Sequence, residues 1–352
     1  MIYSLCTISQ TRQGVGFTIL TKSDFANYLT RCKQTAAPSL YVLGHPAPDG
    51  DAVLSSLFEG WRLTLQGTPA VPLVQAAALP QEVAWLLEEL APLVLTGEAP
   101  RDPACRFVLT DHHHDPLRQA QVVRVVDHHI PPPTIDLSSA DTLIAPVGAT
   151  VTLVTRLLQE QGYTPDGEVA RLLLGGILLD TDGLSAHKAK EEDLVAAGWL
   201  SSLCGEPPAP FYAALQAQLL GETDVVTLYR RDYRTYHTPD GEPLMGFAIL
   251  KVWDTARPDL TAVRRLLAQD AARGDCSVYV AKIMCFTPDG GWGEQLCLAA
   301  GAQAETVLAE LLAVEGAGAV RTAPDLVTLS TTCPRRGRKW YAAHLLPLLA
   351  KN

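Results

Sequence analysis

The 352-residue sequence lacks the marks of several protein classes. It has no uninterrupted apolar run long enough to span a bilayer. Its first residues, MIYSLCTISQTRQG, have neither the lysine-rich start nor the apolar run of a signal peptide. No CxxC pair and no disulfide-rich pattern is found among the eight cysteines, which stand at positions 6, 32, 105, 204, 276, 285, 297 and 333. These absences predict reduced thiols and a cytoplasmic location.

Positive charge is also in short supply, because 28 lysine and arginine residues face 38 acidic residues, for a net charge of -10. No general basic field therefore exists to attract nucleic acid or an anionic membrane, and we expect a small-molecule partner. The sequence leaves a homodimer open. With 47% hydrophobic and 19% charged residues the chain can bury a large core, and its length favours two domains.

Short apolar strands and longer helical patterns alternate along the first two thirds of the chain, which is typical of a parallel sheet. We expect strands at 39–44, 106–111 and 121–129, and helices at 52–66, 147–161 and 168–180. Each predicted strand ends in polar residues. In open α/β sheets, ligands bind in the crevice outside the carboxyl ends of the strands.

The pattern changes after the segment GEPPAPFYAALQAQLLGETD. Segments 232–252 and 277–300 indicate hairpins around the turns PDGE and TPDGGWG, and 261–274 indicates an amphipathic helix. We therefore predict an α/β fold with a mostly parallel sheet and helices on both faces in residues 1–220. A smaller α+β domain is expected in residues 221–352, with a linker near 219–224.

Metal-compatible side chains follow four separate apolar runs. The segment HPAPDGDAVLSS places a histidine and two aspartates directly after the first predicted strand. In chain order, the candidates are His45, Asp49, Asp51, Asp111, Asp127, His128, His129 and Asp180. So many converging carboxylates would repel one another without cations, and oxygen-rich sites with a few imidazoles suit Mn²⁺ or Mg²⁺. Two such ions can ionise a water and neutralise phosphate oxygens, which predicts phosphoryl hydrolysis.

Each motif taken alone has a structural explanation. Asp49 and Gly50 form a common turn pair, and DHH at 127–129 could cap a helix or face solvent. His113 and His114 are interpreted as loop residues. The occurrence of metal-compatible groups at four positions, in order, favours the metal site over these separate explanations.

The ordered motifs HPAPDGDA, TDH, DHH and LLDTD resemble those of the DHH phosphoesterase superfamily. The segments RRDYRTY and CPRRGRKWYAAHLLPLL resemble the second domain of family II inorganic pyrophosphatases and their exopolyphosphatase and prune relatives. The resemblance spans nearly the whole chain. It implies a DHH catalytic domain with the metal site, followed by a DHH-associated substrate-binding domain.

The resemblance also implies roles for the candidates. One metal would be held by His45, Asp49, Asp111 and Asp180, and the other by Asp51, Asp111, His128 and Asp180. His129 would contact the phosphate or assist the leaving group, Asp127 would anchor its loop, and His112 matches a family position beside the bridging aspartate. The implied cofactor is two Mn²⁺ ions, with Mg²⁺ or Co²⁺ as alternatives.

The resemblance assigns substrate binding to cations near the C-terminus, namely Arg234, Arg338 and Lys339. Arg335 and Arg336 are expected to be solvated. Because pyrophosphate and polyphosphate are dense anions, a net-acidic protein needs such local cations, and guanidinium groups suit phosphate oxygens. The site is expected between the domains.

The substrate motifs depart from the pyrophosphatase pattern in several places. PDGDA is closer to the form found in nanoRNases, Arg234 stands where lysine is expected, and Gly337 and Leu179 replace serines. The stretch SDFANYLTRCKQ resembles the leading helix of exopolyphosphatases and prune proteins. Inorganic pyrophosphatase is the leading function and exopolyphosphatase the alternative. A nanoRNase-like phosphodiesterase or a catalytically inactive regulatory binding protein is less favoured.

Overall fold

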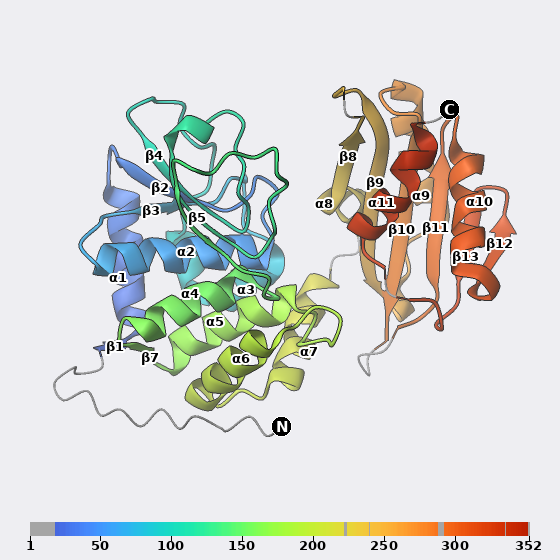
Figure 1. Cartoon of the computed structure of the whole chain (residues 1–352). Coiled ribbons are helices and arrows are strands. Elements are labelled where there is room, and N and C mark those ends of the chain that lie inside the picture. Colours follow the sequence, from blue (N-terminus) through green and yellow to red (C-terminus); the bar gives the residue numbers. More distant parts are fainter. Residues whose placement is uncertain (1–17, 222–223, 239, 288–291, 335, 351–352) are drawn as a thin grey trace, which may run out of the picture. The chain divides into compact units, whose positions relative to one another are not determined.

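A computed structural model describes residues 18–350 except 222–223, 239, 288–291 and 335, and it does not describe the side chain of Lys339. The chain divides into two compact units, Met1–Gln216 and Ala217–Asn352 (Figure 1). Each unit has its own sheet and its own core, so each is described by itself. Among the described residues, no helix combines the length and apolar character needed to cross a membrane.

The first unit alternates strands and helices. Its strands are β1 (Thr18–Leu20), β2 (Leu40–Leu43), β3 (Val71–Leu73), β4 (Arg106–Thr110), β5 (Val122–Asp127), β6 (Asp141–Ile144) and β7 (Tyr163–Pro165). Its helices are α1 (Lys22–Gln34), α2 (Gly50–Leu65), α3 (Gln81–Leu87), α4 (Thr150–Glu160), α5 (Gly167–Asp180), α6 (Glu191–Cys204) and α7 (Pro208–Leu219), the last of which continues past Gln216.

Five strands form a parallel sheet in the order β3-β2-β4-β5-β6, and β1 pairs separately with β7. The chain leaves β2 toward β3 on one side, whereas it leaves β4 toward β5 on the other. The carboxyl ends of β2 and β4 therefore flank the point where the strand order reverses. Loops diverge at such a point and leave a crevice for ligands.

The faces of this sheet are apolar on both sides. Val42 and Val108 point to the face where Leu63 of α2 packs, whereas Leu43 and Phe107 belong to the opposite cluster. Helices α2, α4 and α5 pack against one another beside the sheet (Figure 1). Burial on both faces explains why the central strands β2 and β4 are rich in hydrophobic residues, and it makes the strand ends the natural place for polar groups.

The second unit is a mixed α+β structure. Its strands are β8 (Tyr233–His237), β9 (Pro243–Trp253), β10 (Val278–Phe286), β11 (Gln295–Ala300), β12 (Ala319–Ala323) and β13 (Leu326–Leu329). Its helices are α8 (Val225–Arg231), α9 (Leu260–Arg273), α10 (Ala304–Glu315) and α11 (Arg338–Leu349). The strand order is β12-β13-β11-β10-β9-β8, in which β9 and β10 are parallel and the other pairs are antiparallel.

Alternate residues of β9 serve opposite faces of this sheet. Phe247 and Ile249 join the cluster that includes α10 and α11, whereas Ala248 and Leu250 join the cluster that includes α8 and α9. This follows from the two-residue repeat of a strand. The second sheet is thus covered by helices on both faces (Figure 1).

The predicted α/β fold is confirmed, as are the predicted strands and helices, with end shifts of a few residues. The two predicted hairpins correspond to the antiparallel pairs β8–β9 and β10–β11. The expectation of a solvated Arg336 is wrong, because its guanidinium carbon lies 3.6 Å from the centre of the Trp340 ring and its Nε lies 3.5 Å from Glu315. Arg335, of which the same was expected, lies outside the described residues. The apolar segment that follows is α11, which packs Tyr341 and Leu345 into the core and so holds Arg336 against the unit.

A fully buried lysine lies at the centre of the second unit. The Nζ of Lys282 on β10 donates hydrogen bonds to the carbonyl of Arg336 at 2.8 Å and to the Tyr341 hydroxyl at 3.0 Å. The Tyr341 hydroxyl in turn donates to Glu315 at 3.1 Å. Burial lowers the pKa of Lys282 from 10.5 to about 8, against the opposing effects of Cys297 and Glu315. Through its bond to the Arg336 carbonyl, Lys282 holds the segment before α11 against the sheet. Burial of its positive charge is unfavourable.

We expect the stability of the wild type relative to Lys282→Met to rise with pH between about 8 and 10.5. In that window the unfolded lysine keeps its proton while the folded one has lost it, so the unfolded state binds more protons and stability increases with pH. Across this pH window, the free energy of unfolding of the wild type should rise by about 3 kcal/mol relative to that of Lys282→Met. Urea unfolding of both proteins at several pH values measures it, with Lys251→Met as the control on the neighbouring strand. A difference that stays flat with pH would contradict the prediction.

Candidate metal centre

Three neighbouring parallel strands deliver most of the candidate ligands. His45, Asp49 and Asp51 follow β2, Asp111 follows β4, and the Asp127–His129 segment begins at the last residue of β5. Asp180 is the last residue of α5, which packs against α2. At Gly50 a Cβ atom would lie 2.5 Å from the Cδ1 of Leu179, so glycine is what lets the start of α2 approach the end of α5.

The first group of donors is His45, Asp49 and Asp111. The Nε2 of His45 lies 3.6 Å from the Oδ2 of Asp49 and 3.4 Å from the Oδ2 of Asp111. The Oδ1 of Asp49 accepts a hydrogen bond from the Ala52 amide at 3.1 Å and caps α2. The structural and the metal-binding explanations of Asp49 are therefore compatible, because each uses a different oxygen of the carboxylate.

The second group of donors is Asp51, His128 and Asp180, whose donor atoms all lie within 4.8 Å of one another. The carboxylate of Asp51 accepts hydrogen bonds from the amides of Thr150 at 2.6 Å and Val151 at 2.8 Å, in the first turn of α4. The positive end of a helix dipole favours a carboxylate there. Each oxygen keeps a further lone pair for another partner.

Asp111 links the two groups. Its Oδ2 faces His45, and its Oδ1 lies 3.3 Å from the Nε2 of His128. The residue is buried and has a φ of 60°, a left-handed conformation that is uncommon outside glycine and that clusters at functional sites. Its amide donates to the Val126 carbonyl at 3.0 Å, which fixes this conformation against β5.

The charges of the cluster show why it suits cations. Burial lowers the pKa values of His45 and His128, but neighbouring carboxylates outweigh it and raise both pKa values to about 10. Burial and the nearby Asp111 and Asp180 raise the pKa of Asp51 well above its usual value, and burial raises that of Asp180 to about 6. The crowded negative charges thus favour protonation of the His45 and His128 rings and of the Asp51 and Asp180 carboxyl groups. Divalent cations fit this donor set, because carboxylate oxygens and imidazole nitrogens are ligands that Mn²⁺ and Mg²⁺ accept.

A buried aspartate supports the loop that orients these ligands. Asp193 accepts hydrogen bonds from the Gly148 amide and from the Thr152 hydroxyl, each at 2.6 Å. A Cβ atom on Gly148 would lie 2.6 Å from Asp193, so glycine is required for this contact. In the same loop, the Val147 carbonyl bonds the Nδ1 of His128 at 3.1 Å. This bond directs the Nε2 of His128 toward the carboxylates.

Asp127, the fully buried residue at the end of β5, holds two histidines. Its Oδ1 contacts the Nδ1 of His129 at 2.9 Å and accepts from the His129 amide at 2.9 Å. Its Oδ2 contacts the Nδ1 of His113 at 2.6 Å. The interpretation of His113 as an ordinary loop residue therefore overlooked this contact, and only its position two residues after Asp111 gave a signal in the sequence.

Two further residues frame the site. His112 contacts the Thr110 carbonyl through Nδ1 at 2.9 Å, and its Nε2 is buried with no hydrogen-bond partner in the described part of the chain. Lys188 was not predicted. Its Nζ lies 4.0 Å from the Oδ1 of Asp180 and donates to the carbonyl of that residue at 2.8 Å. It supplies positive charge beside Asp180.

The predicted substrate-binding cations belong to the second unit. Arg338 begins α11 and donates to the carbonyl of Asp232 at 2.7 Å, and it also forms an ion pair with the carboxylate of Asp232. Arg234 lies on β8 and donates to the Tyr233 carbonyl at 2.9 Å. Burial raises the pKa of the Tyr236 hydroxyl, and the positive charges of Arg338 and Arg234 oppose this rise. Both guanidinium groups therefore lie near that phenol. Lys339 follows Arg338 in α11, and its side chain lies outside the described residues.

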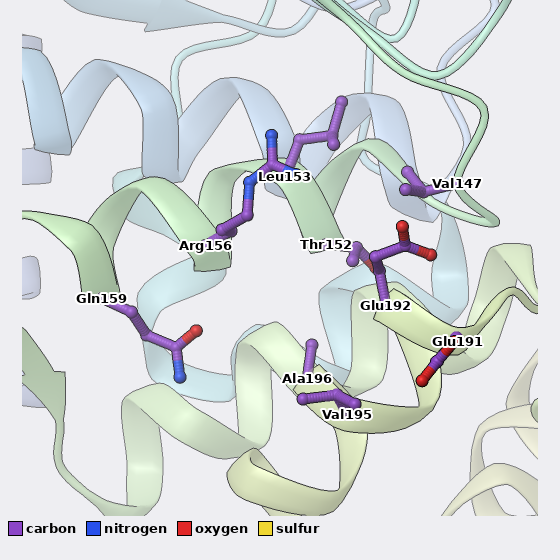
Figure 2. A pocket seen from close by; sticks show the side chains of 9 residues that line it. All are labelled: Val147, Thr152, Leu153, Arg156, Gln159, Glu191, Glu192, Val195 and Ala196. Carbon is purple, nitrogen blue, oxygen red and sulfur yellow. The ribbon is translucent and has the colours of Figure 1, made fainter. Parts of the chain in front are cut away.

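A separate surface pocket of about 280 Å³ lies between α4 and α6. Figure 2 shows Arg156 and Gln159 of α4 and Glu192 and Val195 of α6 among the residues that line it. Its wall also includes Val147, whose carbonyl bonds His128. None of the predicted metal ligands lines this pocket, so it is distinct from the metal centre although the two share a loop.

Comparisons with known proteins show which family the chain resembles. Residues 39–177 match the family model described as "DHH family, N-terminal domain". A Deinococcus radiodurans protein named "Probable manganese-dependent inorganic pyrophosphatase" is 30% identical over 259 residues, which cover 67% of this chain and 80% of that protein. A manganese-dependent inorganic pyrophosphatase of Methanothrix thermoacetophila is 28% identical over 185 residues, which cover 50% of this chain and 58% of that protein.

A solved structure agrees in fold. A crystal structure from Methanococcus jannaschii, described as a candidate family II inorganic pyrophosphatase, superposes with a TM-score of 0.66 at 18% identity. The superposition covers 89% of this chain and 98% of the other. The chain belongs to the DHH family, in the branch that contains the manganese-dependent inorganic pyrophosphatases.

Proposed function

We propose that the protein is a metal-dependent hydrolase of phosphoanhydride bonds, with inorganic pyrophosphate as its main substrate and two Mn²⁺ ions as its cofactor. The observation that carries the proposal is the pair of donor groups linked by Asp111, His45 with Asp49 on one side and His128 on the other. The relatives named as manganese-dependent inorganic pyrophosphatases supply the reaction class and the metal.

The ligand sets follow the two donor groups. His45, Asp49, Asp111 and Asp180 would hold one ion, and Asp51, Asp111, His128 and Asp180 the other. Bound divalent cations neutralise phosphate oxygens and lower the pKa of a water so that it can attack phosphorus. The protein contributes rigid placement, because backbone amides fix Asp51 and the Val147 carbonyl fixes the tautomer of His128.

The substrate would be bound by groups around this centre. We assign a phosphate contact or leaving-group role to His129, which lies 3.6 Å from Asp111 through its Nδ1 and is about one-third exposed. Arg234, Arg338 and Lys339 would bind phosphate oxygens, for which guanidinium forks are well suited. The roles of Asp127 as an anchor and of His112 beside Asp111 belong to the same proposal.

A second candidate substrate is polyphosphate. The helix α1 precedes the central sheet, and its sequence resembles the leading helix of exopolyphosphatases. Both substrates are cleaved at the same kind of bond, so the metal centre alone does not distinguish them. A cytoplasmic location and a homodimer stay predictions.

A substrate panel tests the proposal. We expect rapid Mn²⁺-dependent release of phosphate from pyrophosphate, slower release from long-chain polyphosphate and none from a dinucleotide. Metal-free protein with excess chelator is the control. Preferential hydrolysis of polyphosphate would favour the second candidate, whereas turnover of the dinucleotide alone would overturn both. No turnover of any of the three would favour a binding protein.

A further inference from the structure

Asp127 divides its carboxylate between two imidazoles. Its Oδ1 is taken by the backbone amide and the ring of His129, whereas its Oδ2 contacts the Nδ1 of His113 at 2.6 Å. The Asp127 side chain is fully buried, and the His113 side chain is only 16% exposed. Leaving a buried carboxylate oxygen without a hydrogen-bond donor is unfavourable, so the His113 contact is a substantial constraint on the carboxylate.

The plane of a carboxylate is fixed when both oxygens are held. With His113 on Oδ2, the Asp127 group has no freedom to rotate about its Cβ–Cγ bond without breaking a short contact. His129 depends on that plane, because its ring and its amide both reach Oδ1 at 2.9 Å. The ring of His129 also meets that of His128 edge to face, with centroids 4.1 Å apart. Rotation of the Asp127 carboxylate would therefore break at least one of its two contacts with His129, through the amide or through Nδ1.

We propose that His113 is a positioning residue that fixes the Asp127 carboxylate and, through it, the orientation of the His129 ring. The inference rests on the proposed function, in which His129 meets the substrate. By donating through Nδ1 to Asp127, His129 keeps Nε2 as its remaining nitrogen for that contact. His113 contacts the other oxygen of the same carboxylate, so in this proposal it acts on His129 through Asp127.

Three variants separate positioning from simple structural support. His113→Ala removes the donor, whereas His113→Asn keeps a side-chain N–H of similar reach. His114→Ala changes the next histidine in the same loop, whose side chain is exposed. Each is assayed for pyrophosphate hydrolysis with Mn²⁺, and its melting temperature shows whether it is folded.

We expect His113→Ala to lower kcat by about 10- to 100-fold with less than about a threefold change in KM, the range typical when a supporting hydrogen bond of a metal-site residue is lost. His113→Asn should recover most of this loss, and His114→Ala should match the wild type. An unchanged kcat in His113→Ala would overturn the proposal. Equal losses in the alanine and asparagine variants would do the same, because they would point to ring volume rather than to the hydrogen bond.

A spectroscopic readout is independent of activity. In metal-free protein with ¹⁵N-labelled histidine, the short His113–Asp127 contact should give a strongly deshielded imidazole N–H proton, and the His129–Asp127 contact a second. His113→Ala should remove the first signal and shift the second, while His113→Asn returns the second toward its wild-type position. A His129 signal that does not move in His113→Ala would overturn the positioning role. If the wild type failed to hydrolyse pyrophosphate, the function would be wrong while this spectrum still tested the geometry.

Discussion

Asp111→Asn is expected to abolish pyrophosphate hydrolysis, with a fall in kcat on the order of a thousandfold or more. Asp111 is the residue whose two oxygens face the two donor groups, at 3.4 Å from His45 and 3.3 Å from His128. An amide offers one oxygen and an NH₂ group, and the NH₂ group cannot ligate a cation. A thousandfold loss corresponds to about 4 kcal/mol of activation free energy.

The fold of this variant should survive. Asparagine has nearly the same shape as aspartate and tolerates the φ of 60° at this position. Because Asp111 faces the His45 and His128 imidazoles, loss of its charge should lower the melting temperature of the metal-free protein without unfolding it. Asp182→Asn is a matched control, because Asp182 also has a positive φ, of 50°, and pairs with Lys188 outside the donor groups. Retained activity in Asp111→Asn would remove this residue from the link between the two metals.

Addition of Mn²⁺ to metal-free protein is expected to raise the melting temperature of the first unit by about 20 °C when both sites are filled. Two of the carboxylates in the cluster, Asp51 and Asp111, are buried, so cations that bind only the folded state relieve their repulsion. Each site filled at a thousand times its Kd adds about 4 kcal/mol to stability. For a unit of this size, each kcal/mol shifts the midpoint by about 2–4 °C.

Differential scanning calorimetry with and without Mn²⁺ measures this shift. The rise should be much smaller in Asp111→Asn and unchanged in Asp182→Asn, and it should be reversed by a chelator. A wild-type midpoint that moves by less than about 1 °C at saturating Mn²⁺ would show that the cluster is held together without cations.

The sequence predicted those parts of the fold whose signal is local. The central strands β2 and β4 are largely buried on both faces, so they read as apolar runs with polar residues at their ends, and β5 does so apart from Arg124. The three-residue strands β1, β3 and β7 were not predicted because so short a stretch carries no periodicity. The pairing of β1 with β7 joins residues more than 140 positions apart, and no local pattern records such a contact.

The same distinction holds at the site. His45, Asp49, Asp111 and His128 could be proposed because each lies at or shortly after the end of a recognisable apolar run, and parallel strands bring such ends together. The contact of His113 with Asp127 depends on how two loops meet, and Asp193 supports Gly148 from 45 residues away. Lys188 reaches Asp180 because the chain after α5 folds back on itself. These contacts arise from tertiary packing, which a single sequence does not encode in any short motif.

The most direct test of the metal centre is the number of Mn²⁺ ions that metal-free protein binds in equilibrium dialysis. The linked donor groups around Asp111 predict two ions per wild-type chain, with magnetic coupling between them, and fewer than two in Asp111→Asn. Binding of no ions, or of one isolated ion, by the wild type would contradict a paired metal centre.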